Sequence, residues 1–101
     1  MRIEVVGRNI EVTDSIRQYA EKRSEKLGRY LDMVQQITYT IEKESAAKEI
    51  FKVELVVDVE HHANFVSHDT GHDMYALIDS VTDKTARQLT DFKERFKLNN
   101  R

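Results

Sequence analysis

The feature that most constrains this fold is a long amphipathic stretch over residues 73–96. The residues suited to a buried helix face recur at intervals of three and four, which is the spacing of one side of an α-helix. These residues are Met74, Leu77, Ile78, Val81, Thr85, Leu89, Phe92 and Phe96. Asp73 precedes the first of them and is suited to cap the helix N-terminus. At about 1.5 Å per residue the helix would be about 35 Å long, so it needs an extended apolar surface to cover.

Length and composition indicate one soluble domain. The chain of 101 residues predicts a single domain over residues 1–101, and its 40% apolar and 34% charged residues are ordinary globular proportions. No apolar run is long enough to span a membrane, and residues 1–5 do not resemble a secretory signal. The absence of cysteine excludes disulfides, a thiol nucleophile and thiolate metal ligands. We expect a cytoplasmic protein with no membrane partner.

Alternating apolar and polar residues predict strands in the remaining chain. In the clearest of them, Val53, Leu55 and Val57 face one way. The charged residues Lys52, Glu54 and Asp58 face the other way. Thr13 is suited to cap a first helix, which shows helical spacing of its apolar residues. In chain order the expected elements are a strand over 1–8, a helix over 15–31, strands over 36–43, 50–60 and 64–69, and a helix over 73–96.

This order predicts an α+β fold with the sequence β-α-β-β-β-α. The short links between the last three strands imply an antiparallel meander. Strands with one apolar and one wet, acidic face fit a four-stranded sheet that is covered on one side only. Both helices are therefore expected to pack side by side on the same face of the sheet.

The formal net charge is −2, yet basic residues gather on helix flanks. Lys22, Lys26 and Arg29 fall within roughly 60° of one another on a helical wheel. Arg23 lands inside the apolar stripe, so we expect its stem to pack and its guanidinium to reach out. Lys84 and Arg87 are three residues apart, which makes them neighbours on one shoulder of the second helix.

Two segments resemble the signatures of a known family. GRNIEVTDSIRQYAEKRSEKLGRYLD near the start and DMYALIDSVTDKTARQL near the end are similar to those of ribosome hibernation promoting factors. That family includes the ribosome-associated inhibitor A proteins, also called sigma-factor modulation proteins. The resemblance covers essentially the whole chain, and it implies a fold like the double-stranded-RNA-binding domain.

The resemblance also implies a function and a partner. Such proteins bind the small ribosomal subunit in the channel for messenger RNA and transfer RNA, and so inhibit translation in resting cells. They contact ribosomal RNA through basic residues of both helices. The positions that match are Arg23, Lys26 and Arg29 on the first helix and Lys84 and Arg87 on the second, while the wheel adds Lys22. The chain resembles the short form, which is associated with ribosome pairing and often with a ribosome modulation partner protein.

The chain departs from the family pattern in three places, one of which is its end soon after the second helix, as in the short form. Ser24 stands where an apolar residue would help to seat the first helix. Thr90 and Asp91 stand where the second helix is usually basic, and Asp91 falls near Lys84 on the wheel. We expect these departures to weaken RNA affinity more than the fold.

No pattern in the chain indicates catalysis, a cofactor or a small-molecule substrate. There is no glycine-flanked nucleophile turn and no glycine-rich phosphate loop. His68 and His72 straddle Gly71, so they are not expected to share a helical face, and we expect no metal site.

Asp79 and Asp83 lie four residues apart, and we expect them to pair with nearby Lys84 and Arg87 rather than to act in acid–base chemistry. If these charged residues form only a solvent-exposed helix face held by such pairs, other functions remain open. One alternative is a small α+β protein-interaction module whose basic ridges meet an acidic protein partner. Another is a general binder of double-stranded RNA.

Overall fold

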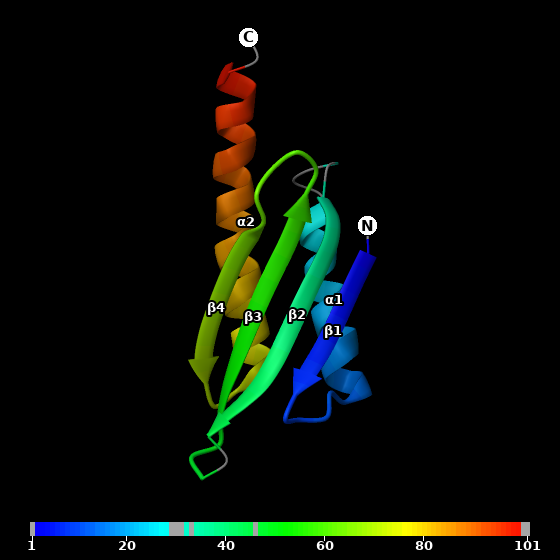
Figure 1. The fold of residues 1–101 in the computed structure, drawn as a ribbon, viewed down its shortest axis with the longest axis vertical. Helices are drawn as coiled ribbons and strands as arrows, with labels where there is room; N and C mark the ends of the chain where they lie inside the picture. The colour runs from blue at the N-terminus through cyan, green and yellow to red at the C-terminus, as the bar shows by residue number, and fades with distance from the viewer. Residues whose placement is uncertain (1, 29–31, 33, 46, 100–101) are drawn as a thin grey trace.

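The computed structural model describes residues 2–28, 32, 34–45 and 47–99. The expected α+β order is confirmed (Figure 1). The first strand of the expected meander is the longest one, because Glu44 and Ser45 extend it rather than forming a link. The elements are β1 (Arg2–Arg8), α1 (Asp14–Gly28), β2 (Val34–Ser45), β3 (Ile50–Val59), β4 (Phe65–Gly71) and α2 (Met74–Asn99).

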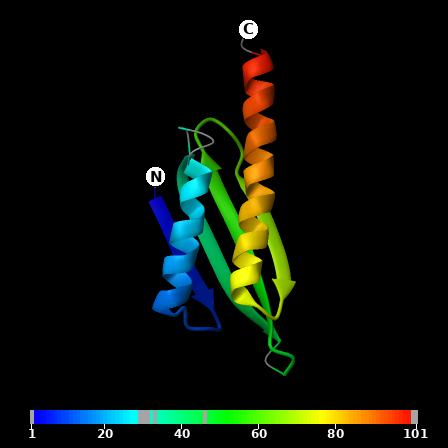
Figure 2. The same ribbon diagram turned by 180° about the vertical axis from the view of Figure 1, so that it is seen from behind.

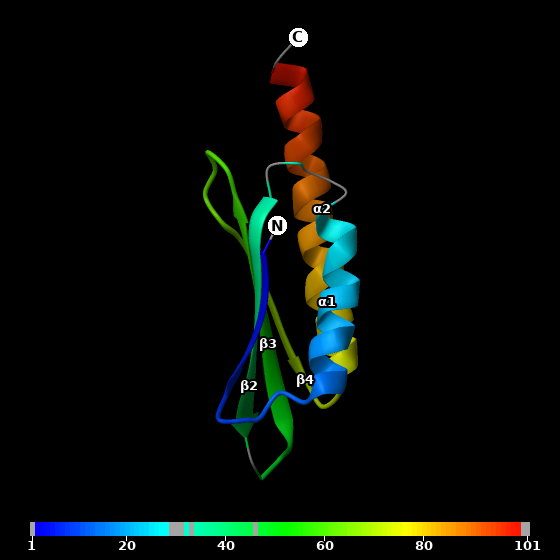
Figure 3. The same cartoon turned by 90° about the vertical axis from the view of Figure 1, so that its right-hand side faces the viewer.

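The sheet is mixed, with strand order β1-β2-β3-β4. The predicted meander is confirmed, since β2, β3 and β4 pair antiparallel. β1 instead runs parallel to β2, because α1 forms the crossover between them. Seen from behind, both helices lie next to each other across one face of the sheet (Figure 2), and the side view shows two layers (Figure 3). The likeness to the double-stranded-RNA-binding domain stays a prediction.

The core lies between these two layers. Val53, Leu55 and Val57 of β3 are fully buried, as their alternation predicts. The charged residues Lys52, Glu54 and Asp58 face the open side. Ile78 and Leu89 of α2 cover them from the other layer. The open face carries no helix in the described part of the chain, so one side of the sheet is buried and the other is exposed to solvent (Figure 3).

Both predicted helix caps are present. The Thr13 Oγ1 atom accepts a hydrogen bond of 3.2 Å from the backbone N–H of Ile16. The Asp73 Oδ1 atom accepts bonds from the N–H groups of Tyr75 at 3.0 Å and Ala76 at 3.4 Å. Because free N–H groups at a helix start otherwise lack partners, these two side chains fix where α1 and α2 begin.

A glycine lets the chain turn from β1 into α1. A Cβ atom on Gly7 would overlap the carbonyl oxygen of Ile10 and lie 2.9 Å from Val12 Cγ2. The turn also places Asn9 in the left-handed region, with φ of 58°, which asparagine tolerates better than most residues. The connection therefore folds back tightly against the strand that it leaves.

One buried hydrogen-bond chain ties α2 to the middle of the sheet. The Thr82 hydroxyl donates to the carbonyl oxygen of Ile78 at 2.7 Å. Its oxygen also lies 2.7 Å from the Tyr39 hydroxyl, which therefore donates to it. Burial of Tyr39 raises the pKa of its hydroxyl to about 12, since the charged phenolate would lose its hydration.

We expect Tyr39→Phe to lower the free energy of unfolding by about 1 kcal/mol at pH 8, because one buried hydrogen bond is lost. The raised pKa of Tyr39 means that its contribution is intact below the ordinary value of 10.0 and is lost as pH rises through about 12. Urea denaturation at several pH values should therefore show the gap between wild type and variant shrinking above pH 10. A gap that stays constant up to pH 12 would contradict this account.

Candidate nucleic-acid interface

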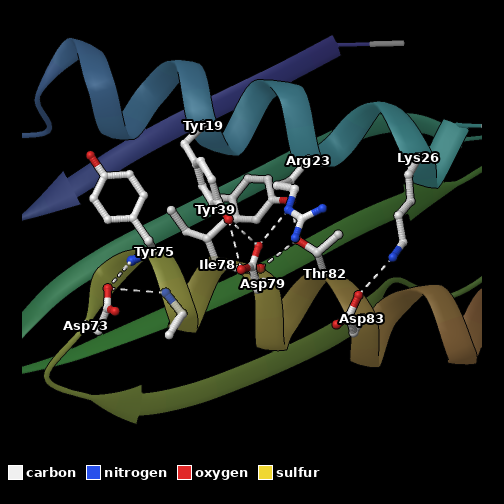
Figure 4. A network of polar contacts seen from close by, with 11 residues as sticks. Tyr19, Arg23, Lys26, Tyr39, Asp73, Tyr75, Ile78, Asp79, Thr82 and Asp83 are labelled. Atoms are coloured by element: carbon white, nitrogen blue, oxygen red, sulfur yellow. Dashed lines mark hydrogen bonds and ion pairs between the residues drawn. The ribbon is translucent and has the colours of Figure 1, made fainter.

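The two helices run parallel, and their polar contacts advance along both together. Tyr19 and Arg23 of α1 meet Asp79 of α2, and one turn further Lys26 meets Asp83 (Figure 4). This pairing sets the register of one helix against the other. It also decides which basic side chains reach solvent between them.

Asp79 is the centre of the contact between the helices. Its carboxylate accepts a hydrogen bond of 2.6 Å from Arg23 Nε and bonds of 2.7 and 2.9 Å from the Tyr19 hydroxyl. The Arg23 guanidinium carbon lies 5.7 Å from the centre of the Tyr19 ring, and Tyr75 packs edge-on against that ring at 4.9 Å. Figure 4 shows these side chains converging from both helices. α1 is thereby fixed to the first half of α2.

The same contacts shift the protonation equilibria of the three groups. Partial burial raises the pKa of the Asp79 carboxyl, but the hydrogen bonds from Arg23 and Tyr19 outweigh it, so the pKa lies below its usual value. The hydrogen bond to Asp79 raises the pKa of Arg23 and is also the main cause of the raised pKa of Tyr19. Asp79 is therefore an anion and Arg23 a cation at neutral pH.

A second pair joins the helices further along. Lys26 Nζ lies 2.9 Å from Asp83 Oδ1, and 40% of the Lys26 side chain and 61% of the Asp83 side chain are exposed. Exposed pairs of this kind contribute about 0–1 kcal/mol, so the contact is easily exchanged. The prediction that Asp79 and Asp83 pair with Lys84 and Arg87 of their own helix is wrong. Both aspartates lie on the side of α2 that faces α1, where Arg23 and Lys26 reach them first.

The predicted basic residues of α1 gather around one depression. Lys22, Arg23 and Lys26 line a hollow of about 380 Å³ together with Tyr19 and Glu25. Arg29 lies outside the described residues. The predicted ridge on α1 is therefore present as far as Lys26.

Lys26 also lines an adjoining hollow of about 390 Å³ with Arg87, and the other residues lining it are Asp83, Ala86, Thr90 and Asp91. The two hollows share Lys26, and we call them together the interhelical groove: α1 alone lines its first half, and both helices line its second half. Cations from both helices meet in the second half, as the sequence predicts, but two aspartates share it.

Lys84 is set apart from this groove. Its Nζ donates to the carbonyl oxygen of His68 at 3.3 Å and lies 3.7 Å from Asp69 Oδ2, both in β4. Hydrogen bonds from the Ser80 hydroxyl and the Thr70 N–H lower the pKa of Asp69, so this carboxylate is charged. Lys84 is thus held on the β4 side of α2, and the shoulder that it was predicted to share with Arg87 is divided.

Two of the predicted cations are free for an external ligand. Lys22 and Arg87 are exposed, and neither forms a hydrogen bond or ion pair with any residue that the structure describes. Arg23 uses its Nε atom for Asp79, while a guanidinium has five N–H donors in all. The groove therefore offers unused donors on both helices.

The departures from the family pattern have different consequences. Ser24 is fully buried, and its hydroxyl donates to the Glu21 carbonyl oxygen at 2.7 Å, so α1 seats with a satisfied polar group. Arg23 does not lie in the buried stripe where the helical wheel placed it. Its side chain is exposed and reaches Asp79 on α2. Asp91 lines the groove beside Arg87, where its charge opposes an anionic ligand.

The chain is similar to known proteins in family, in sequence and in structure. A family model described as sigma 54 modulation protein / S30EA ribosomal protein matches residues 3–97. The ribosome hibernation promoting factor of Escherichia coli (strain K12) is 33% identical over 100 residues, covering 96% of this chain and 98% of that protein. The ribosome hibernation promotion factor of Lactococcus lactis is 32% identical over 95 residues, which are 94% of this chain and 51% of that protein.

A solved structure agrees with these similarities. The N-terminal domain of Protein Y from Thermus thermophilus superposes with a TM-score of 0.80 and 30% identity, covering 91% of this chain and 99% of that one.

The fold and the groove define a small α+β binding protein whose cations converge between two parallel helices. The chain belongs to the sigma 54 modulation protein / S30EA ribosomal protein family. The resemblance to ribosome hibernation promoting factors is confirmed, and with it the expectation of a protein that is not an enzyme. In the described part of the chain, no helix is long and apolar enough to cross a membrane. Within the same residues, no three metal-ligating side chains cluster.

We expect Asp79→Asn to reduce stability at pH 6 but hardly at all near pH 2. A lowered pKa in the folded state stabilises above the ordinary value of 3.8, and this stabilisation is lost as pH falls through the folded value. Urea denaturation of both proteins from pH 6 to pH 2 measures the effect. Asp83→Asn is the matched control, since that exposed carboxylate should cost little at any pH. Equal losses in the two variants would contradict the central role of Asp79.

Proposed function

We propose that this protein binds the small ribosomal subunit in its decoding and transfer-RNA channel and inhibits translation in resting cells. The observation that carries the proposal is the interhelical groove, where cations of α1 and α2 meet on the solvent side of the helix layer. Membership of a family whose relatives are named for ribosome hibernation supports it. The proposed RNA-binding residues are Lys22, Arg23, Lys26, Arg29, Lys84 and Arg87. Ribosome binding would place the protein in the cytoplasm.

Phosphate contacts explain how such a groove binds RNA. Lys and Arg side chains that neutralise phosphates release condensed counterions, and this drives binding without reading base sequence. Packed RNA helices are recognised mainly by shape and backbone contacts, which suits two parallel helix flanks. Arg87 and the spare donors of Arg23 are suited to hold two phosphate oxygens at once.

Asp83 has a distinct part in this proposal. Its carboxylate contacts Lys26 Nζ as a phosphate oxygen would, so it holds the side chain across the groove before RNA arrives. Because the pair is exposed, a phosphate replaces Asp83 at low cost. Asp79 differs, since three hydrogen bonds hold it and keep Arg23 in place.

A second candidate is binding to an acidic protein partner through the same groove. The observation that favours it is the mixed charge of the second hollow, where Asp83 and Asp91 stand beside Lys26 and Arg87. An interrupted basic surface binds a long polyanion less well than a continuous one. Salt dependence separates the two candidates, because counterion release from RNA is much the steeper.

We expect the double variant Lys26→Glu/Arg87→Glu to abolish binding to vacant small subunits in a co-sedimentation assay at low salt. If about six phosphates are contacted, the wild type should lose roughly a thousandfold in affinity between about 50 and 200 mM salt. Lys48→Glu/Lys52→Glu is the control, since it makes the same charge change in the exposed turn between β2 and β3 and on the open face of the sheet. Loss of binding in the control alone, or salt-independent binding by wild type, would contradict the proposal.

Asp83→Asn should strengthen binding to small subunits several-fold at the same salt concentration. The substitution removes a negative charge from the groove and releases Lys26 to a phosphate, while an exposed position costs little stability. Binding isotherms of wild type and variant measure the change. Weaker binding by the variant would mean that Asp83 contacts the partner directly, as expected for the second candidate.

A further inference from the structure

A third hollow lies on the other flank of α2, outside the interhelical groove. Three rings form one side of it: His62 in the turn after β3, Phe65 in β4 and Phe92 in α2. The rings of His62 and Phe65 are stacked, 6° from parallel with centroids 4.8 Å apart. Phe92 meets them edge-on at 4.4 and 5.6 Å. The site is therefore a built aromatic surface rather than a scatter of exposed rings.

Polar groups complete this hollow. Gln88, Asp91 and Arg95 of α2 line it together with the three rings. The Gln88 Oε1 atom is buried, and it accepts no hydrogen bond from any group that the structure describes. A buried carbonyl oxygen without a donor costs free energy unless a ligand supplies one. The hollow thus presents an acceptor that needs an N–H group.

The size and rigidity of the hollow restrict its ligand. Its volume is about 230 Å³, which is below the range of roughly 300–1,000 Å³ that drug-sized ligands occupy, so it suits one planar group. His62 is fixed beforehand, because its Nδ1 atom donates to the carbonyl oxygen of Ala63. A flat ring with N–H donors on its edge would extend the stack and reach Gln88.

We propose that this aromatic hollow binds one unstacked base of a single-stranded RNA segment. The inference rests on the proposed RNA-binding function and adds a base contact to it. Asp91 lines both the interhelical groove and this hollow, so a strand whose phosphates follow the groove passes its entrance. Arg95 stands at the same hollow to meet the next phosphate, and stacking of bases on aromatic rings accepts any base sequence.

The polar groups favour a base over an aromatic side chain of a protein partner. Adenine, cytosine and guanine carry exocyclic amino groups that donate hydrogen bonds, whereas a phenylalanine ring has no donor for Gln88. Uracil donates only through its ring N3–H, and the two carbonyl oxygens that flank this group would repel the Gln88 Oε1 atom. Arg95 adds a positive charge that suits the phosphate attached to every base. We therefore expect adenylate or cytidylate to bind better than uridylate.

The test compares two ten-residue strands of equal charge, oligoadenylate and an abasic ribose-phosphate strand, by fluorescence anisotropy at low salt. The wild type should bind oligoadenylate about tenfold more tightly, the size expected for stacking one base. His62→Asn should remove most of that difference, whereas His61→Asn should keep it. His61 is the neighbouring exposed histidine, does not line the hollow, and has a φ of 61° that asparagine tolerates.

Gln88→Leu gives a second variant that keeps all three rings in place. It should reduce the preference for oligoadenylate over oligouridylate without changing affinity for the abasic strand. Backbone amide spectra of each variant confirm that the turn and α2 keep their fold.

Equal binding of both strands by wild type would overturn the inference, and so would equal losses in the two histidine variants. Shifts of the His62 and Phe92 resonances with N-acetyltryptophanamide but not with adenosine monophosphate would assign the hollow to a protein side chain instead. Failure of this inference leaves salt-sensitive pelleting with small subunits intact. Failure of the proposed function would remove that pelleting as well.

Discussion

One apolar face of a four-stranded sheet has to be covered, and this constraint determines the rest of the molecule. The inward residues of β2 and β3, such as Tyr39 and Leu55, are fully buried, so both helices must pack on the same side. Two helices on one narrow sheet necessarily adjoin. Their neighbouring flanks then form a groove, and polar side chains on those flanks must find partners across it. The groove is a consequence of the core rather than an addition to it.

Charge in this groove stabilises the packing of the two helices and, in the proposed function, also binds the ligand. Asp79 binds Tyr19 and Arg23 tightly enough to set the register of α1 against α2. Asp83 holds Lys26 through an exposed contact that a phosphate is able to replace. The net charge of −2 therefore hides a surface in which some cations are committed and others are free. In the proposed function, the protein would bind a polyanion through the arrangement of its charges rather than through their sum.

The sequence determined most of the fold and part of the site. The spacing of apolar residues, two in strands and three to four in helices, predicted every strand and both helices, because each element has one apolar face. Thr13 and Asp73 marked the helix starts for the same local reason. The partners of Asp79 and Asp83 could not be found this way, since they depend on the register between two helices distant in sequence. The aromatic hollow was missed for a similar reason: His62 and Phe92 lie thirty residues apart, and only the folded turn joins them.

The central claim is that the interhelical groove is the surface that meets the small ribosomal subunit. Lysine acetylation read by mass spectrometry tests it most directly, because the reagent reports each exposed amine separately. With vacant small subunits present, the account predicts strong protection of Lys22 and Lys26 and no protection of Lys48 in the turn between β2 and β3. Protection of Lys48 while Lys22 and Lys26 stay reactive would contradict the account and place the interface elsewhere.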